Sequence, residues 1–292
     1  MAQVTKHRVA GALIAVLALV ACGSSKSSGT ASSSTGAAAA DTTIVIGPDG
    51  SSTVVEVPSD TSPSANTPST AGGGGGSTAI DSNGPPGSFA PGILLPSASS
   101  EVVVEVRTQS GTGPQQASID HLTSVLRNVT GKPVSVAQGP SIGGGAKSWS
   151  ADDLRSAADG GAAQGNGRAV IHLLFVHGSF SGDDSVLGVA VRGDVAAVFT
   201  DQVNSSSTLL VGSSGIETAV VTHEVGHLMG LVDLYLHTGR QDPDHPGHST
   251  NSQSVMYWAV ESNLVADLLQ GGPPTDFDSA DLADLQTIRN SG

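Results

Sequence analysis

The stretch His223-Glu-Val-Gly-His-Leu-Met-Gly-Leu-Val-Asp233 decides how the rest of the chain is interpreted. An α-helix turns by about 100° per residue, so His223 and His227 share one face and can hold one metal ion. Glu224 is offset by about a quarter of a turn, which lets it take a proton from a metal-bound water. Gly230 can adopt a positive φ and return the chain, which would bring Asp233 beneath the histidines as a third ligand. Three protein ligands with one open position are typical of catalytic zinc.

The helix that carries these residues is predicted to be buried. The run from Ile216 to Met229 is apolar almost all round. Ser214, with Glu217 three residues later, predicts a capping box at its start. Buried histidines and a buried glutamate are costly unless something pairs with them, and a metal ion does so. The alternative is a core helix with incidental histidines.

The motif resembles the zinc-binding consensus of the metzincin peptidases, HExxHxxGxx(H/D), in the aspartate variant of snapalysin-like enzymes. A second metzincin feature, the methionine turn, is matched by Ser254-Val-Met256-Tyr257. The resemblance implies an α+β, metzincin-like zincin fold, in which a twisted mixed β-sheet accompanies the active-site helix, the methionine turn and a C-terminal helix. It also implies that Met256 packs under the zinc and that Tyr257 lies near the specificity pocket.

One globular domain is predicted over residues 97–292, with the length of an ordinary single core. Hydrophobic periodicity and turn residues predict its elements in chain order. The expected strands are 101–106, 133–137, 169–176, 186–191 and 195–199. The expected helices are 114–129, 150–158, the zinc helix and 279–288. By the same resemblance, strand 186–191 is the edge strand that pairs with an extended substrate.

Three histidines downstream of the motif compete with Asp233 for the third ligand position. His237, His245 and His248 lie in a polar segment rich in Pro and Gly, which predicts a loop. The spacing of the family motif favours Asp233, and a loop histidine could instead contact the substrate. Upstream, Asp183 and Asp184 could bind calcium through carboxylate oxygens, but a solvated loop is the simpler interpretation.

The N-terminal third has the pattern of an exported, lipid-anchored protein. Residues 1–21 combine a positive start with a 12-residue apolar run, which is short for a membrane span and typical of a signal peptide. Leu19-Val-Ala-Cys22 resembles a bacterial lipobox, so Cys22, the only cysteine, is expected to carry lipid. An ordinary secretory signal with a chance cysteine is the alternative. Residues 22–96 predict a flexible tether with a small hairpin within 42–57.

Together these features predict a zinc-dependent endopeptidase, lipid-anchored on the extracytoplasmic side of the membrane or secreted, that acts on peptides or proteins. One catalytic Zn²⁺ would be held by His223, His227 and Asp233, with Glu224 as the general base. A net charge of −14 argues against nucleic acid as a partner, and we expect a monomer. The alternative is a zinc-holding envelope lipoprotein that binds partners or wall polymer without turnover.

Overall fold

The computed structural model describes residues 42–46, 52–56, 80–208, 211–263, 265 and 272–292. The chain divides into two units, residues 1–39 and 40–292. The first unit, with the predicted signal peptide and Cys22, lies outside the described residues, as does most of the predicted tether. Within the described ranges, no helix combines the length and apolar character needed to cross a membrane.

Strand β1 (Thr42–Ile46) pairs antiparallel with β2 (Ser52–Glu56), over the residues for which the hairpin is predicted. Residues 47–51, which include the expected turn, lie outside the described part of the chain.

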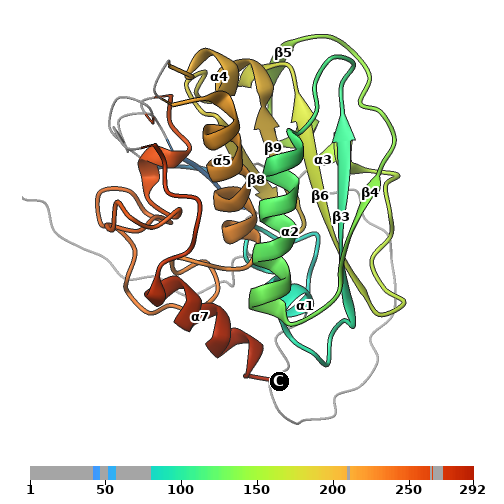
Figure 1. Ribbon diagram of the computed structural model, residues 1–292, viewed down its shortest axis with the longest axis vertical. Coiled ribbons are helices and arrows are strands. Elements are labelled where there is room, and N and C mark those ends of the chain that lie inside the picture. Colours follow the sequence, from blue (N-terminus) through green and yellow to red (C-terminus); the bar gives the residue numbers. More distant parts are fainter. Residues whose placement is uncertain (1–41, 47–51, 57–79, 209–210, 264, 266–271) are drawn as a thin grey trace, which may run out of the picture. The chain divides into compact units, whose positions relative to one another are not determined.

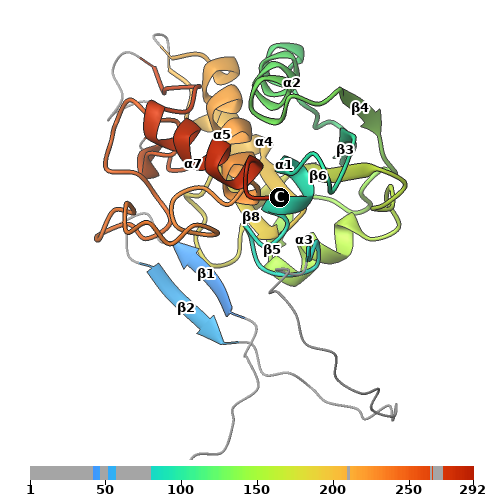
Figure 2. The same cartoon turned by 90° about the horizontal axis from the view of Figure 1, so that it is seen from below.

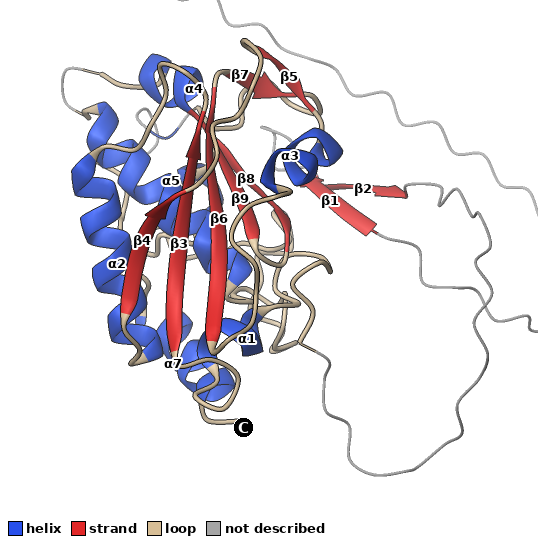
Figure 3. Cartoon of the chain, turned by 90° about the vertical axis from the view of Figure 1, so that its right-hand side faces the viewer, coloured by secondary structure: helices blue, strands red, loops and turns tan. Residues whose placement is uncertain are grey.

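The central layer is a mixed five-stranded sheet with the strand order β4-β3-β6-β9-β8 (Figures 1 and 3). Its strands are β3 (Glu101–Thr108), β4 (Val134–Gln138), β6 (Arg168–Val176), β8 (Gly188–Arg192) and β9 (Val195–Phe199). All neighbours are parallel except β8, which runs antiparallel to β9 at the edge. β6 is central and almost entirely buried, as expected for a run of apolar residues between parallel neighbours. The predicted strand 186–191 therefore does reach a sheet edge.

Helices cover both faces of this sheet (Figure 3). One face carries α2 (Gln116–Thr130) and α5 (Ser213–Leu228), which pack against each other, and α3 (Ala151–Ala158) lies on the other. The apolar stripe of α2 faces the core, and Gly131 ends that helix with a φ of 68°. Ser150 caps α3 in a reciprocal capping box with Asp153.

The packed part of the chain begins before residue 97. Helix α1 (Ala90–Leu94) is buried throughout, and Ile93 and Leu94 are among the core residues. The same helix contacts α7 (Ser279–Arg289), so residues 90–94 lie beside the last helix of the chain (Figure 2). The remaining short elements are β5 (Lys147–Trp149), β7 (Gly178–Phe180), α4 (Thr200–Ser205) and the 3-10 helix η1 (Trp258–Val260).

The start of α5 differs from the sequence prediction. The helix begins after Gly212 without a side-chain cap, so the predicted capping box of Ser214 and Glu217 does not form. Glu217 instead accepts a 2.6 Å hydrogen bond from the backbone N–H of Gln115, the residue before α2. Its carboxylate therefore satisfies a free N–H at the start of another helix rather than of its own.

Candidate metal centre and active site

Helix α5 holds the histidines and the glutamate of the central motif in the core. It packs against β8 and β9, and both His223 and Glu224 are fully buried. Apolar side chains surround the helix, as the sequence predicts, and His223, Glu224 and His227 are all buried among them. Such groups have to be satisfied by each other or by a ligand.

Two further side chains converge on the histidines of α5. The Nε2 atoms of His223 and His227 lie 3.0 Å apart. One ligand atom each from His223, His227, His248 and Glu261 lies within 4.8 Å of all the others. Among the described residues, no other group of three or more His, Cys, Asp or Glu side chains converges in this way.

The methionine turn orients the first histidine. Nδ1 of His223 lies 2.7 Å from the carbonyl oxygen of Val255, and because a carbonyl can only accept, Nδ1 carries the proton. Nε2 then has a free lone pair facing the cluster. The turn is itself braced, because the Ser254 hydroxyl accepts from the N–H of Met256 and donates to the buried carboxylate of Asp281.

The loop that carries His248 is tied to the same turn. The N–H of Ser249 donates to the carbonyl of Met256 at 2.8 Å. Within the loop, the N–H of Asp242 donates to the carbonyl of His248 at 2.7 Å. His245 stacks on Trp258 with ring centroids 4.4 Å apart. These contacts hold His248 fully buried, with its ring 5.1 Å from that of His223.

Asp233 does not join the cluster. Gly230 has a φ of 81° and ends the helix as predicted, but Val232 and Asp233 are also left-handed, with φ values of 53° and 68°. The chain therefore curls into a further turn, where the Asp233 carboxylate accepts hydrogen bonds from the N–H and hydroxyl of Thr238 and the N–H of Gln241. Burial raises the pKa of Asp233, but these hydrogen bonds lower it by more. The loop therefore stabilises the ionised carboxylate by itself.

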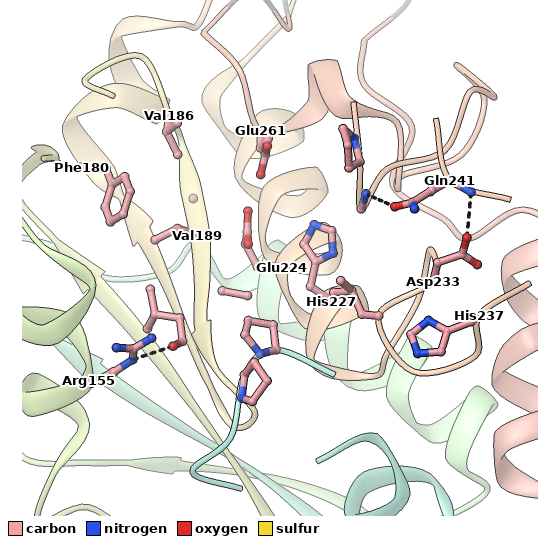
Figure 4. Close-up of a pocket in the computed structure, with 18 of the residues that line it drawn as sticks. Arg155, Phe180, Val186, Val189, Glu224, His227, Asp233, His237, Gln241 and Glu261 are labelled. Carbon is pink, nitrogen blue, oxygen red and sulfur yellow. Dashed lines mark hydrogen bonds between the residues drawn. The ribbon is translucent and has the colours of Figure 1, made fainter. Parts of the chain in front are cut away.

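The three downstream histidines take different places. His248 joins the cluster, His245 packs on Trp258, and His237 lines the cavity beside Asp233 (Figure 4). The sequence left all three open, and nothing in their spacing singles out His248. Glu261 carries no sequence signal at all, and only its place after the methionine turn brings it to the site.

Glu224 lies on the wall of a cavity of about 650 Å³ that His227 and Glu261 also line (Figure 4). Burial and the charge of Glu261 raise its pKa well above the ordinary value. The N–H of Ala190 lies close enough to offset this effect in part, but not in a geometry that makes a hydrogen bond. Both Glu224 oxygens thus have no hydrogen-bond partner among the described residues. A base that is free to take up a proton has this environment.

Met256 forms the floor beneath α5. It is fully buried, and a Cβ added at Gly226 would lie 2.4 Å from its sulfur atom. The glycine of the motif therefore makes room for the methionine. Tyr257 is half-buried beside Trp258 and is not among the residues that line the cavity.

The cluster has the donor set that a metal ion requires. Burial, and then the neighbouring His223 and His248, lower the pKa of His227, which favours the neutral imidazole. Nδ1 of His227 and both ring nitrogens of His248 have no hydrogen-bond partner within the described ranges. Imidazoles and a carboxylate are suitable ligands for Zn²⁺. An ion bound between the rings would also explain why their nitrogen atoms face one another.

In the loop considered for calcium, hydrogen bonds within the loop bind one of the two carboxylates. One oxygen of Asp183 accepts from the N–H and the hydroxyl of Ser185, and Asp184 is exposed.

Comparison with solved structures finds distant similarities. The archaemetzincin of Methanopyrus kandleri is 20% identical, covering 65% of this chain and 96% of its own, with a TM-score of 0.46. The archaemetzincin of Archaeoglobus fulgidus is 16% identical, covering 63% and 99%, with a TM-score of 0.38. A zinc-dependent peptidase of Methanocorpusculum labreanum is 18% identical, covering 62% and 99%, with a TM-score of 0.39. The sequence matches no protein-family model and no curated protein. Similarities this distant establish neither activity nor family membership.

Proposed function

We propose that this chain is a zinc-dependent endopeptidase of the metzincin type, with His223, His227 and His248 as zinc ligands and Glu224 as the general base. The observation that carries the proposal is the convergence of three buried imidazoles beside a buried, unpartnered carboxylate on the wall of a cavity. His248 replaces Asp233 in the ligand set expected from the sequence.

When bound, zinc supplies Lewis acidity that polarises a peptide carbonyl and makes water more acidic. The chain supplies the rest. The three imidazoles would hold the ion through ring nitrogen lone pairs, and Val255 fixes the tautomer of His223. His223 and His248 are themselves fully buried.

Glu224 moves the proton. One of its carboxylate oxygens accepts a proton from the attacking water, and the same group then gives it to the amine that leaves when the peptide bond breaks. Its position suits this exchange, because both carboxylate oxygens are without a hydrogen-bond partner among the described residues and the residue lines the cavity.

The substrate is an extended peptide that pairs with β8. This strand lies at the edge of the sheet, and its residues Gly188–Val191 line the cavity together with Glu224. Backbone pairing gives affinity without demanding a particular sequence. The apolar residues Phe180, Val186 and Val189 of the cavity would favour substrates with apolar side chains (Figure 4).

Export and anchoring rest on the sequence alone. The proposed enzyme carries lipid on Cys22 and is tethered to the outer side of the membrane through residues 22 onwards. Replacing Cys22 by serine should release the chain from the membrane fraction and leave peptidase activity unchanged. A Cys22→Ser chain that stays membrane-bound, or a wild-type chain found only in the soluble fraction, would remove the anchor from the proposal.

The test of the activity is cleavage of a diverse quenched-peptide library by the full chain in detergent, with zinc content determined in parallel. Activity that disappears in a zinc-loaded Glu224→Ala variant supports the proposal. Zinc without cleavage by the wild type would favour the alternative of a zinc-holding binding protein. Folded protein that takes up no zinc would refute both.

A further inference from the structure

We propose that Glu261 is a fourth ligand that closes the metal centre at rest, and that an incoming substrate has to displace it. This inference rests on the proposed function, because it concerns the same ion. It adds a regulatory step that neither the motif nor the methionine turn contains.

Both oxygens of Glu261 face the imidazole nitrogens of the cluster. Oε1 lies 3.2 Å from Nε2 of His248, and Oε2 lies 3.6 Å from Nε2 of His223. The side chain is only 13% exposed, although it belongs to a loop. A carboxylate oxygen and three imidazoles are all ordinary zinc ligands, and four protein ligands fill a tetrahedral site. With a zinc ion bound, Glu261 would therefore take the position that a catalytic site keeps open for water.

The backbone around Glu261 is held by the segment that leads into β8. The N–H of Leu187 donates to the carbonyl of Glu261 at 2.8 Å, and the N–H of Asn263 donates to the carbonyl of Ser185 at 3.0 Å. Between them, Val186 and Ser262 form an antiparallel bridge. Residues 261–263 are thus paired with residues 185–187, directly before the edge strand begins.

This pairing links the metal centre to the substrate-binding edge. Glu261, Val186 and Glu224 line one cavity, with the two carboxylates on the same wall (Figure 4). A peptide that pairs with β8 and extends beyond Gly188 meets the segment that carries Glu261. Moving that segment withdraws the carboxylate and opens the fourth position when substrate is present. A peptide too short to reach the segment leaves the carboxylate in place.

The experiment compares metal binding by the full chain and two variants, Glu261→Gln, which keeps the volume, and Glu261→Ala. Each is loaded with Co²⁺, and chelator competition gives the affinity while visible absorption reports the ligand set. The matched control is Asp233→Asn, which removes a carboxylate that lies in the turn after α5, outside the cluster, and keeps a residue that tolerates its positive φ.

We expect both Glu261 variants to bind Co²⁺ about tenfold or more weakly, the loss that even an indirect partner of a metal ligand can cause. Their visible bands should shift as water replaces the carboxylate, while Asp233→Asn keeps the wild-type affinity and spectrum. Metal-saturated Glu261→Gln should cleave short peptides at least as fast as the wild type.

Unchanged affinity and spectrum in both variants would overturn the inference. So would a loss of affinity without a spectral shift, because Glu261 would then only position His248. A wild-type chain that binds no Co²⁺ or Zn²⁺ at all would instead refute the proposed function, so the two failures are distinguishable.

Discussion

Nδ1 of His223 lies 2.7 Å from the carbonyl oxygen of Val255, which is 32 residues further along the chain. This contact joins the zinc helix to the methionine turn and fixes which ring nitrogen is free. The same turn accepts a hydrogen bond from Ser249, next to His248, and leads into Glu261 through η1. One short turn therefore positions proposed ligands from three parts of the chain.

His248→Ala should lose bound zinc, while Asp233→Asn should retain it. The imidazole of His248 belongs to the buried cluster, whereas the carboxylate of Asp233 is engaged by Thr238 and Gln241. Zinc per protein molecule after dialysis against a weak chelator is the measurement. If Asp233→Asn loses the metal and His248→Ala keeps it, the ligand set expected from the sequence is correct.

Glu224→Gln should keep zinc and lose about 10²–10⁴-fold in peptidase rate, the usual contribution of a general base. The amide matches the carboxylate in volume, and the protein groups that hold the metal are unchanged. Circular dichroism and metal analysis establish that the variant is folded and loaded. Substantial cleavage by a loaded Glu224→Gln protein would show that another group takes the proton.

Gly226→Ala should destabilise the protein by about 1–3 kcal/mol, because its new methyl group would clash with the buried Met256 and Phe277. Gly215→Ala is the matched control in the same helix. Its Cβ would meet nothing within 4 Å, and the higher helix propensity should stabilise by up to about 1 kcal/mol. Urea denaturation of both variants measures the difference. Equal changes in the free energy of unfolding would mean that the Met256 side chain moves aside at no cost when residue 226 gains a methyl group.

Glu217 should make stability depend on pH. Burial raises its pKa above the ordinary value of 4.5, and the N–H groups of Gln115 and the hydroxyl of Ser118 offset this only in part. Between 4.5 and the raised value, the folded chain holds a proton that the unfolded chain has released, so stability falls as the pH rises through that range.

Glu217→Gln removes this titration and keeps an oxygen that can accept from Gln115. The free energy of unfolding of the wild type, relative to the variant, should therefore decrease between about pH 4 and about pH 8. Parallel urea titrations at the two pH values measure it. A relative stability that increases with pH would mean that hydrogen bonding outweighs burial at this carboxyl.

Much of the fold follows from local patterns. Strand β6 is a continuous apolar run and forms the sheet centre, and α2 keeps its apolar stripe on the core with Gly131 at its end. The cap of α5 could not be predicted in the same way. Ser214 and Glu217 have the right spacing, but Glu217 is attracted to a free N–H at α2, a contact between residues 102 apart in the chain.

The sequence by itself determined the motif helix and the relation between His223, Glu224 and His227, because helix geometry depends only on spacing along the chain. It also determined the glycine return at Gly230, which needs a residue that tolerates a positive φ. Only the tertiary structure decided which groups complete the cluster. Asp233 has the expected spacing but lies in a turn whose N–H groups bind its carboxylate. His248 is placed by the bond of its neighbour Ser249 to the methionine turn, and Glu261 by a bond to the segment before the edge strand. Contacts between distant parts of a chain leave no periodic signal in sequence, so no spacing rule could have selected them.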